Sequence, residues 1–486
     1  MTESTLLRAI SATLMPGFDG PTLPRWLAAE LDEGLGSVCL FDSNIADPDQ
    51  LQRLTTAIHD VRPEALIATD EEGGDVTRLY HLSGSPHPSA AFLGRQDSPD
   101  ATEAVGYGIG TELRAAGIDL NLAPDADVNA NSRNPVIGVR SFGADSRLVA
   151  RHVAAYVRGV QRAGIAACAK HFPGHGDTAT DSHRDLPIVD VDRATLARRD
   201  LVPFAAAVDA GTLAVMTSHI LVPAVDPELP ATLSRAVLSL LRDDLGFDGV
   251  IVSDALDMAG ASRGRGIAEA AVLALAAGVD LLCIGSGNTG EQVAAIRAHV
   301  ADAVRTGRLD EARVFDAAER VAGLAAWLTG RRGEPASRSE AAAVDPAVFW
   351  RRGPLAPVAA PVVLTLDSVG NPALARTPWG IGEHLRAELD RWLPGATCGT
   401  AHDLGELGTV LGAHRDRPLV VQGRDLGRVP LLAEAIRLVE QQRPDAIVVE
   451  LGWPELPGVC DIATYGAGRG QCIGLIRLLA SGSLVA

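Results

Sequence analysis

The chain has 486 residues, of which 47% are hydrophobic and 21% charged, and its formal net charge is −18. This composition is ordinary for a soluble globular protein and excludes a fibrous repeat or a disordered chain. The negative charge argues against a protein that binds nucleic acid or an anionic membrane surface, so we expect neither as a partner. The length predicts two domains, one of them large.

The N-terminal stretch and the cysteines indicate where the protein works. No basic region followed by a long apolar core opens the chain, so we expect neither a signal peptide nor a membrane-spanning helix. Six cysteines are too few for a disulfide framework, and no CxxC spacing suggests zinc. Cys39, Cys168 and Cys283 lie inside apolar runs and are expected to be buried thiols. These features predict a protein of the reducing cytoplasm.

Residues 1–330 alternate short apolar runs with longer amphipathic stretches, of which Leu148–Ala163 and Ile267–Ala277 have helical periodicity. The runs are apolar on both faces, as buried parallel strands are. Eight such strand–helix units predict an α/β fold of the TIM (β/α)8 barrel type, with an open doubly wound sheet as the alternative. The eight expected strands are Ile10–Met15, Val38–Phe41, Ala65–Asp70, Asp119–Pro124, Ala166–His171, Leu213–His219, Gly249–Asp254 and Asp280–Gly285.

The rest of the chain predicts a second, smaller domain. Residues 331–360 are rich in Arg, Pro, Ala and Ser without strong periodicity, which is typical of a linker. Residues 361–486 are expected to form a small α/β sandwich. No phosphate-binding loop opens its helices, so we expect no nucleotide site there. The expected elements are a closing helix of the first domain at Glu311–Leu328, strands at Val362–Leu366, Leu419–Gly423 and Ala446–Leu451, and a helix at Leu431–Gln442.

Polar residues recur at the C-terminal ends of the expected barrel strands. In a TIM barrel these ends open on one face, where active sites are built. We therefore expect residues that are far apart in the sequence to converge there. The polar positions are Asp70, the DADVNANSR stretch that follows Pro124, Lys170 with His171, His219, and Asp254.

The stretch Lys170–Leu186, KHFPGHGDTATDSHRDL, is the densest in functional groups. It holds three of the twelve histidines, three carboxylates and the only lysine of a chain that has 42 arginines. A compact ammonium with three donors is not equivalent to a planar guanidinium at a tight site. The sequence therefore predicts that Lys170 contacts a ligand oxygen.

Two further units in the sequence suggest chemistry. Asp181 and His183 can lie on the same side of a loop, where the carboxylate would raise the basicity of the far ring nitrogen and make His183 a general acid/base. The alternative is a surface loop whose histidines satisfy local hydrogen bonds. Asp254, at the end of a buried strand, could be a nucleophile, a metal ligand or a structural acceptor.

A metal site is the rival explanation for the histidines and carboxylates of this stretch. The HxxxH spacing of His171 and His175 lies on a Pro-Gly loop rather than on a helix, and no HExxH motif is present. The sequence therefore predicts no metal and no cofactor. The other candidate ligands of this set are Asp177, Asp181 and His183.

Taken together, the motifs resemble those of glycoside hydrolase family 3, in its β-N-acetylglucosaminidase branch. KHFPGHGDTATDSH and VIVSDALDM carry the resemblance. ATDEEGG, DLNLAPDADV, VIGVRSFG, AVMTSHI and PATLS support it in the order the family has them. The matches cover most of residues 1–330, and the resemblance of residues 361–486 to the second domain of two-domain members is looser.

The resemblance implies roles for individual residues. Asp254 matches the catalytic nucleophile, His183 the general acid/base and Asp181 its dyad partner. The residues that match the sugar-binding set, which grips ring hydroxyls, are Asp70, Arg140, Lys170 and His171; Glu71 or Glu72 and His219 are implied to support them.

The implied activity is that of a retaining exo-β-N-acetylglucosaminidase that releases terminal N-acetylglucosamine from cell-wall or chitin fragments. The implied partner is a small carbohydrate, an N-acetylglucosamine-containing oligosaccharide or muropeptide. Because neutral imidazole does not repel anions, phosphate is an alternative acceptor in place of water. A β-glucosidase or β-xylosidase is a competing hypothesis within the family, although such members typically draw the acid/base from the second domain. A non-catalytic sugar-binding protein is the hypothesis from another class.

Overall fold

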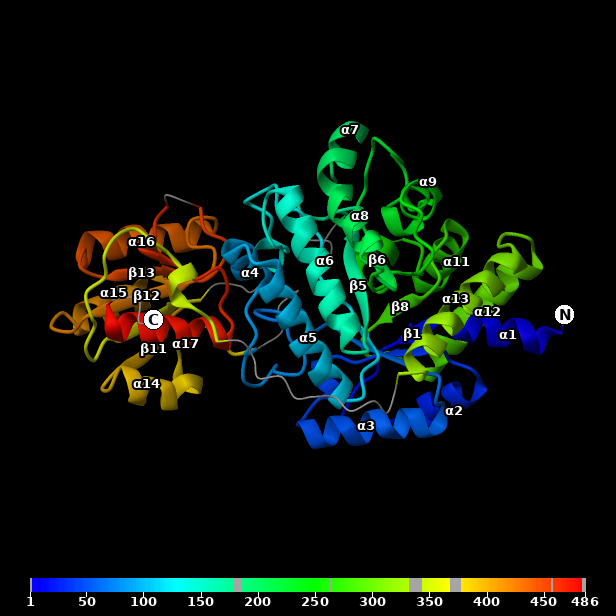
Figure 1. The fold of residues 1–486 in the computed structure, drawn as a ribbon, viewed down its shortest axis with the longest axis horizontal. Coiled ribbons are helices and arrows are strands. Elements are labelled where there is room, and N and C mark those ends of the chain that lie inside the picture. The colour runs from blue at the N-terminus through cyan, green and yellow to red at the C-terminus, as the bar shows by residue number, and fades with distance from the viewer. Residues whose placement is uncertain are drawn as a thin grey trace. The chain divides into compact units, whose positions relative to one another are not determined.

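The computed structural model describes residues 2–178, 186–262, 264–331, 343–367, 377–455 and 458–482. Contacts group the chain into two compact units, which Figure 1 shows coloured along the chain. The first unit comprises Met1–Glu71, Pro99–Pro135 and Ala144–Glu340; the second comprises Glu72–Ser98, Val136–Gly143 and Ala341–Ala486. Two segments from within the first 330 residues thus belong to the second unit. The domain boundaries predicted at residues 330 and 360 stay predictions.

The first unit contains a six-stranded parallel sheet in which β2 to β7 are neighbours in chain order. Strand β1 pairs in parallel with β8, and a bridge between Val252 and Leu281 links the end of β7 to the residue before β8. The parallel α/β architecture is confirmed, and closure into a complete barrel stays a prediction. The strands, all buried, are β1 Leu14–Pro16, β2 Ser37–Cys39, β3 Leu66–Thr69, β4 Leu120–Asn121, β5 Ala166–Phe172, β6 Ala214–Thr217, β7 Val250–Val252 and β8 Leu282–Gly285.

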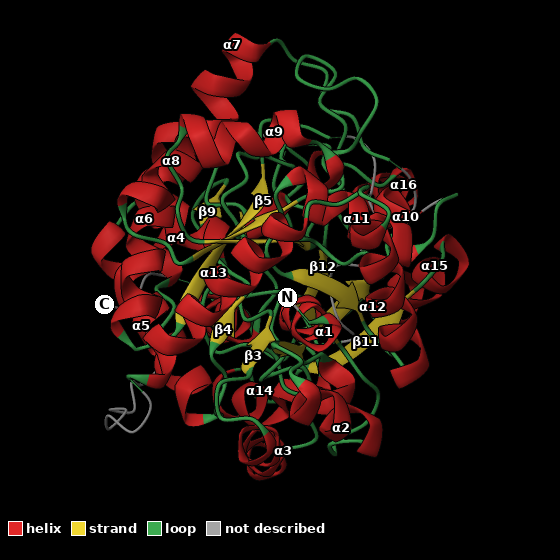
Figure 2. Cartoon of the chain, turned by 90° about the vertical axis from the view of Figure 1, so that its right-hand side faces the viewer, coloured by secondary structure: helices red, strands yellow, loops and turns green. Residues whose placement is uncertain are grey.

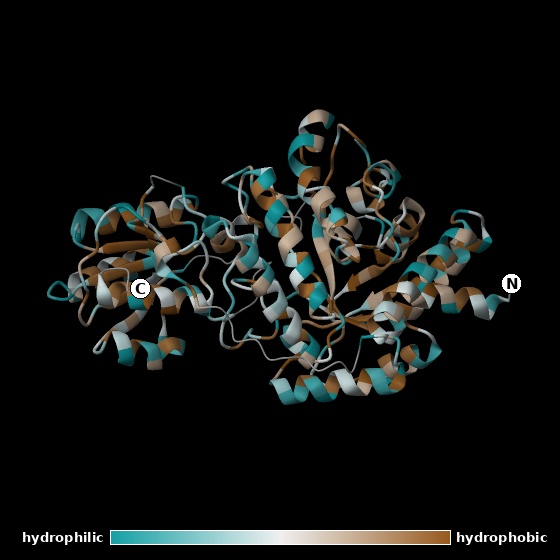
Figure 3. Cartoon of the chain, in the orientation of Figure 1, coloured by the Kyte–Doolittle hydropathy of each residue, from teal (hydrophilic) through white to brown (hydrophobic). Residues whose placement is uncertain are grey.

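Helices surround these strands (Figure 2), and hydrophobic and hydrophilic residues alternate along many of the helices (Figure 3). Helix α6 packs against α5 and β5, and its N-cap is Asp145, whose carboxylate accepts a hydrogen bond from the Leu148 amide. The helices are α1 Glu3–Ala12, α2 Arg25–Glu33, α3 Pro48–Val61, α5 Pro99–Ala115, α6 Ser146–Arg162, α7 Arg193–Thr195, α8 Leu201–Asp209, α9 Arg235–Ser239, α10 Ala259–Ser262, α11 Ile267–Ala277, α12 Gly290–Arg305 and α13 Glu311–Thr329.

One of the eight expected strands is partly helical, whereas the other seven begin within two residues of the predicted position. The stretch Ile10–Met15 was expected to be a strand, but Ile10 to Ala12 form the last turn of α1 and the strand begins at Leu14. A short apolar run cannot by itself distinguish a buried strand from the buried face of a helix. The three helices expected in this unit agree with α6, α11 and α13 to within two residues at each end.

The second unit contains a six-stranded sheet in the order β11-β10-β12-β13-β14-β9, in which only β9 is antiparallel to its neighbour. The second unit has the α/β architecture that was expected of the smaller domain. Strand β9 lies inside the stretch predicted to be a linker, so regular structure begins before residue 361. The elements are α4 Ala90–Gln96, β9 Trp350–Arg351, β10 Val362–Leu366, α14 Arg386–Trp392, β11 Thr397–Ala401, α15 Leu404–Ala413, β12 Leu419–Gly423, α16 Pro430–Gln442, β13 Ile447–Glu450, β14 Ile462–Ala463 and α17 Arg469–Ser481.

The cysteines and helix lengths bear on two further expectations. All six cysteines are free thiols, and Cys39, Cys168 and Cys283 are buried in the strands of the first unit, as expected. Across the described ranges, none of the helices combines the length and the apolar character that a bilayer crossing requires.

Candidate active site

The lone lysine lies on β5 and forms a buried ion pair. Its Nζ donates a hydrogen bond of 2.7 Å to Oδ1 of Asp70, the residue that follows β3. The side chain of Lys170 is 3% exposed and that of Asp70 is 17% exposed. Two residues separated by 100 positions in the sequence thus meet at the C-terminal ends of two strands.

Asp254 follows β7 and, like Lys170 and Asp70, acts electrostatically on the Cys168 thiol. Its Oδ1 accepts a hydrogen bond of 2.8 Å from the Ala255 amide, and the residue is partly buried. Burial raises the pKa of the Cys168 thiol on β5, and the Asp70 and Asp254 carboxylates raise it further while Lys170 opposes them. Asp254 is therefore close to the Lys170–Asp70 pair.

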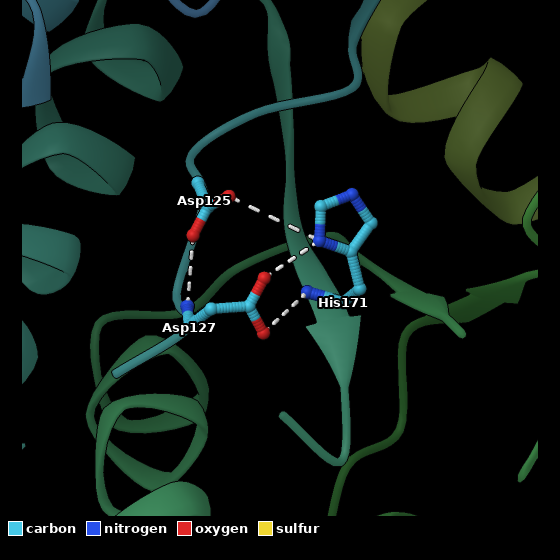
Figure 4. Close-up of side chains that lie close together, drawn as sticks. All are labelled: Asp125, Asp127 and His171. Atoms are coloured by element: carbon cyan, nitrogen blue, oxygen red, sulfur yellow. Dashed lines mark hydrogen bonds and ion pairs between the residues drawn. The ribbon is translucent and has the colours of Figure 1, made fainter. Parts of the chain in front are cut away.

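His171, next to Lys170 on β5, faces two carboxylates from the loop that follows β4 (Figure 4). Its Nδ1 lies 2.7 Å from Oδ2 of Asp127 and 4.0 Å from Oδ2 of Asp125. This loop continues the parallel pairing of β4 with β5, because Asp125 bridges to Lys170. Oδ1 of Asp125 accepts the Asp127 amide at 2.9 Å, which turns the loop so that Asp127 points at His171.

His175 lies on the irregular segment that follows β5. Its amide donates to Oδ1 of Asp127 at 2.5 Å, and its Nδ1 lies 2.9 Å from Oγ1 of Thr178. Asn134 donates to both the His175 carbonyl and the Thr178 hydroxyl. Burial lowers the pKa of His175 to about 4, even though Asp127 and Asp254 act in the opposite direction. The ring is therefore neutral at physiological pH.

The segment that follows β5 also forms an ion pair with the helical turn before α8. Nη1 of Arg199 lies 2.8 Å from Oδ2 of Asp177, and Nη2 lies 3.0 Å from Oδ2 of Asp200. Asp200 has no exposed side-chain surface, and burial raises its pKa to about 6 despite the Arg199 contact. Residues 174–178 are thus held by hydrogen bonds and ion pairs from both flanking loops.

Arg140, expected in the sugar-binding set, lies in the second unit on the short helical turn Gly138–Arg140. Its Nη2 and Nε donate to the two carboxylate oxygens of Glu72 at 2.7 and 3.0 Å. Both side chains are at least nine-tenths buried. Of the two glutamates considered as supporting residues, Glu72 therefore holds Arg140.

His219, the other supporting candidate, contacts the backbone beside Asp254. Its Nε2 donates to the Ala255 carbonyl at 2.9 Å, and its Nδ1 lies 2.9 Å from the Thr232 hydroxyl. His219 is fully buried. The predicted dyad, Asp181 and His183, lies outside the described residues.

Asp125, Asp127 and His171 could in principle bind a metal, since one ligand atom from each lies within 4.8 Å of the others. Nδ1 of His171 is already hydrogen-bonded to Oδ2 of Asp127, and Oδ1 of Asp127 accepts two backbone amides. A cation would have to break these bonds. The cluster is explained as a hydrogen-bonded carboxylate–histidine pair.

Comparison with known proteins identifies the family to which the chain belongs. Residues 25–324 match the glycosyl hydrolase family 3 N-terminal domain, which is more than half of the chain. The chain belongs to glycoside hydrolase family 3. It is therefore an enzyme of the glycoside hydrolase class, as the motifs implied.

Two curated relatives each match more than half of the chain. Beta-hexosaminidase A of Pseudoalteromonas piscicida is 36% identical over 331 residues, which are 62% of this chain and 55% of that protein. The chain thus spans little more than half the length of that relative. Beta-hexosaminidase of Chromobacterium violaceum is 43% identical over 259 residues, which are 51% of this chain and 71% of that protein.

Solved family 3 structures extend the likeness to both units. A glycoside hydrolase family 3 beta-N-acetylglucosaminidase from Paenibacillus sp. str. FPU-7 is 31% identical, has a TM-score of 0.87 and covers 100% of this chain and 98% of its own. NagZ from Neisseria gonorrhoeae, solved in complex with N-trifluoroacetyl-D-glucosamine, is 33% identical with a TM-score of 0.53 and covers 64% of this chain and 98% of its own.

The structure adds two polar partners whose contacts the sequence did not predict. Asp127 stands in the DLNLAPDADV motif, but nothing in its spacing shows that it would meet His171, 44 positions away. The Asp177–Arg199 pair joins a predicted metal-ligand candidate to an arginine 22 positions later. The signal that pointed toward Asp127 was its position just beyond a buried strand.

Proposed function

We propose that this family 3 enzyme is a retaining exo-β-N-acetylglucosaminidase. The observation that carries the proposal is the clustering of the Lys170–Asp70 pair, His171 and Asp254 at the ends of β3, β5 and β7. A carboxylate beside a rigid array of hydrogen-bonding groups suits attack on an anomeric carbon whose sugar hydroxyls are held in place.

In the first step Asp254 attacks the anomeric carbon while His183, oriented by Asp181, protonates the leaving oxygen. In the second step His183 deprotonates water, which releases the sugar from Asp254. Lys170, His171 and Asp70 would bind ring hydroxyls, and the resemblance to family 3 implies the same role for Arg140. General acid/base catalysis of this kind contributes about 10²–10⁴-fold to the rate.

The substrate class follows from the relatives and from the motifs. Two relatives are named beta-hexosaminidase, and the N. gonorrhoeae structure holds a glucosamine derivative. We propose N-acetylglucosamine-terminated fragments of cell wall or chitin as substrates, in the cytoplasm. Phosphorolysis is the second candidate, since a neutral histidine acid/base would admit phosphate where a carboxylate would repel it.

The test is release of 4-nitrophenol from the β-N-acetylglucosaminide and the β-glucoside, with and without phosphate, with the sugar product identified. We expect N-acetylglucosamine at a rate independent of phosphate. A phosphate-dependent rate with sugar 1-phosphate as product would instead establish phosphorolysis, and no turnover of either substrate would overturn the proposed activity.

Asp254→Ala is expected to abolish turnover while the protein stays folded by circular dichroism. The matched control is Asp248→Ala, which removes an exposed carboxylate from the other end of β7. Near-normal activity in Asp254→Ala would remove Asp254 from the role of nucleophile.

His183→Ala should lower kcat/KM for substrates with poor leaving groups far more than for activated aryl glycosides, because only the former need protonation of the leaving oxygen.

A further inference from the structure

Asp127 divides its two carboxylate oxygens between two tasks. Oδ2 lies 2.7 Å from Nδ1 of His171. Oδ1 accepts the backbone amides of His175, at 2.5 Å, and of His171, at 3.4 Å. The side chain has no exposed surface, so no water competes for these bonds. A single buried carboxylate therefore sets both the His171 ring and the start of the segment that follows β5.

The protonation state at this contact can be deduced. Burial raises the pKa of Asp127, but the charges and hydrogen bonds of His171 and His175 outweigh it, and the pKa is lowered overall. An ionised carboxylate can only accept hydrogen bonds, so the proton between Oδ2 and the ring belongs to Nδ1 of His171. Figure 4 shows Nε2 of the ring on the side away from both carboxylates.

We propose that Asp127 is a positioning residue that holds a proton on Nδ1 of His171, so that Nε2, on the far side of the ring, serves as the hydrogen-bond acceptor for a sugar hydroxyl. The inference rests on the proposed function for the identity of the ligand. It gives His171 a role complementary to that of Lys170, which can only donate. A sugar hydroxyl both donates and accepts, so an adjacent donor and acceptor can bind it through both of its capacities.

The substitution Asp127→Asn separates this role from simple packing. The asparagine has the same shape, but only one of its two terminal atoms accepts a hydrogen bond. If its oxygen accepts the His175 amide, its NH2 group faces Nδ1 of His171, which must then lose its proton to Nε2. The variant is therefore expected to invert the tautomer of His171 while the backbone stays in place.

The matched control lies at the opposite end of β4. Asp119 is also a buried carboxylate, and its Oδ2 contacts both His59 Nε2 and the Ile67 amide at 3.0 Å. Asp119→Asn makes the same chemical change in a carboxylate–histidine pair that lies before the strand instead of after it. It is expected to lower the thermal midpoint without changing kcat/KM.

The experiment combines nitrogen NMR of the histidine rings, in protein labelled with ¹⁵N-histidine, with kinetics on 4-nitrophenyl β-N-acetylglucosaminide. In Asp127→Asn we expect the His171 proton to move from Nδ1 to Nε2. We also expect kcat/KM and the affinity for N-acetylglucosamine to fall by about 10–100-fold, by analogy with the loss seen when the carboxylate partner of a metal-bound histidine is removed.

A His171 ring that keeps its Nδ1 proton in Asp127→Asn would overturn the inference. So would kinetics that match those of Asp119→Asn. The tautomer is measured without substrate, so this part is decided even if the wild-type enzyme cleaves no N-acetylglucosaminide. In that case the proposed function falls, whereas an unchanged tautomer in an active enzyme removes only the role of Asp127.

Discussion

Lys170 shows how strongly one position can depend on residue type. Burying an ammonium costs free energy that its pairing with Asp70 only partly returns, so a buried ion pair is weak evidence for a role in stability. Because Lys170 lies beside Asp254 and His171, we assign the Lys170–Asp70 pair a role in ligand binding rather than in stability. The ammonium can exchange one of its three hydrogen bonds for a ligand oxygen without leaving Asp70.

We predict that Lys170→Arg lowers kcat/KM by about 100-fold or more, because the longer planar guanidinium cannot take the place of a compact ammonium in a buried site. The measurement is steady-state kinetics, with folding checked by circular dichroism. The control is the reverse exchange Arg158→Lys on α6, whose pair with Glu103 is exposed. Equal activity in both variants would show that charge alone is needed at Lys170.

His175 makes stability depend on pH. The pKa of His175 is about 4 in the folded protein and 6.5 for an ordinary histidine, as in the unfolded chain. Between these two pH values the unfolded chain therefore binds a proton that the folded chain does not. Stability is therefore complete above pH 6.5 and falls as the pH drops toward 4. The loss between pH 7 and pH 5 is about 2 kcal/mol.

Urea unfolding at pH 7 and pH 5 measures this loss. His175→Gln should reduce the difference in unfolding free energy between the two pH values, whereas His402→Gln, at an exposed position, should leave it unchanged. A wild-type pH dependence in His175→Gln would assign the acid sensitivity to other groups.

At the residue scale, the sequence predicts that strand-end residues converge, but it does not predict which of them contact one another, as Asp127 shows. The convergence of strand-end residues was predicted correctly, because parallel strands place their C-terminal ends on one side. The particular partners depend on register: Asp125 bridges to Lys170, and this places Asp127 opposite His171. Register between strands is set by packing and has no signature within either strand.

At the scale of elements, residues 173–178, which follow β5, approach two neighbouring loops closely. Gly174 adopts a positive φ of 130° and passes within contact distance of Asp200, while Gly176 passes close to the backbone of Val128. The glycines of the HFPGHG motif therefore serve close approach between loops.

We predict that Gly176→Ala strongly impairs activity and lowers the thermal midpoint. A Cβ atom at this position would lie 1.8 Å from the Val128 carbonyl oxygen, so the backbone of one loop must move. Gly323→Ala is the control, since a Cβ there meets nothing within 4 Å and alanine favours the helix interior. Calorimetry and initial rates distinguish them, and an unaffected Gly176→Ala would show that the two loops can separate without cost.

Helices and strands were predicted well where the hydrophobic pattern of the sequence was long or fully apolar, and poorly where it was short or interrupted by exposed positions. Helix α11 was predicted at its observed bounds, because eleven residues between glycines leave little ambiguity. Strand β11 was missed because it is an edge strand in which most positions are exposed, so it has no apolar run. Strand β9 has only two residues, and its pairing with β14 creates it.

For the molecule as a whole, we predict that chelation leaves activity unchanged. In the only cluster of potential metal ligands among the described residues, Nδ1 of His171 and both carboxylate oxygens of Asp127 are engaged in hydrogen bonds. Dialysis against EDTA, followed by assay with and without added Mg²⁺, Mn²⁺ or Zn²⁺, should give rates equal within about twofold, as expected where no ion supplies charge stabilisation. Loss of activity that one of these ions restores would require a metal site.

The single lysine also gives the whole protein an unusual chemical simplicity. A reagent that acylates side-chain amines has one target in 486 residues, and that target is 3% exposed and held by Asp70. Modification of that amine therefore reports on one place in the molecule. A bound sugar that covers Lys170 would slow its acylation, so the protein carries its own occupancy probe without any engineered label.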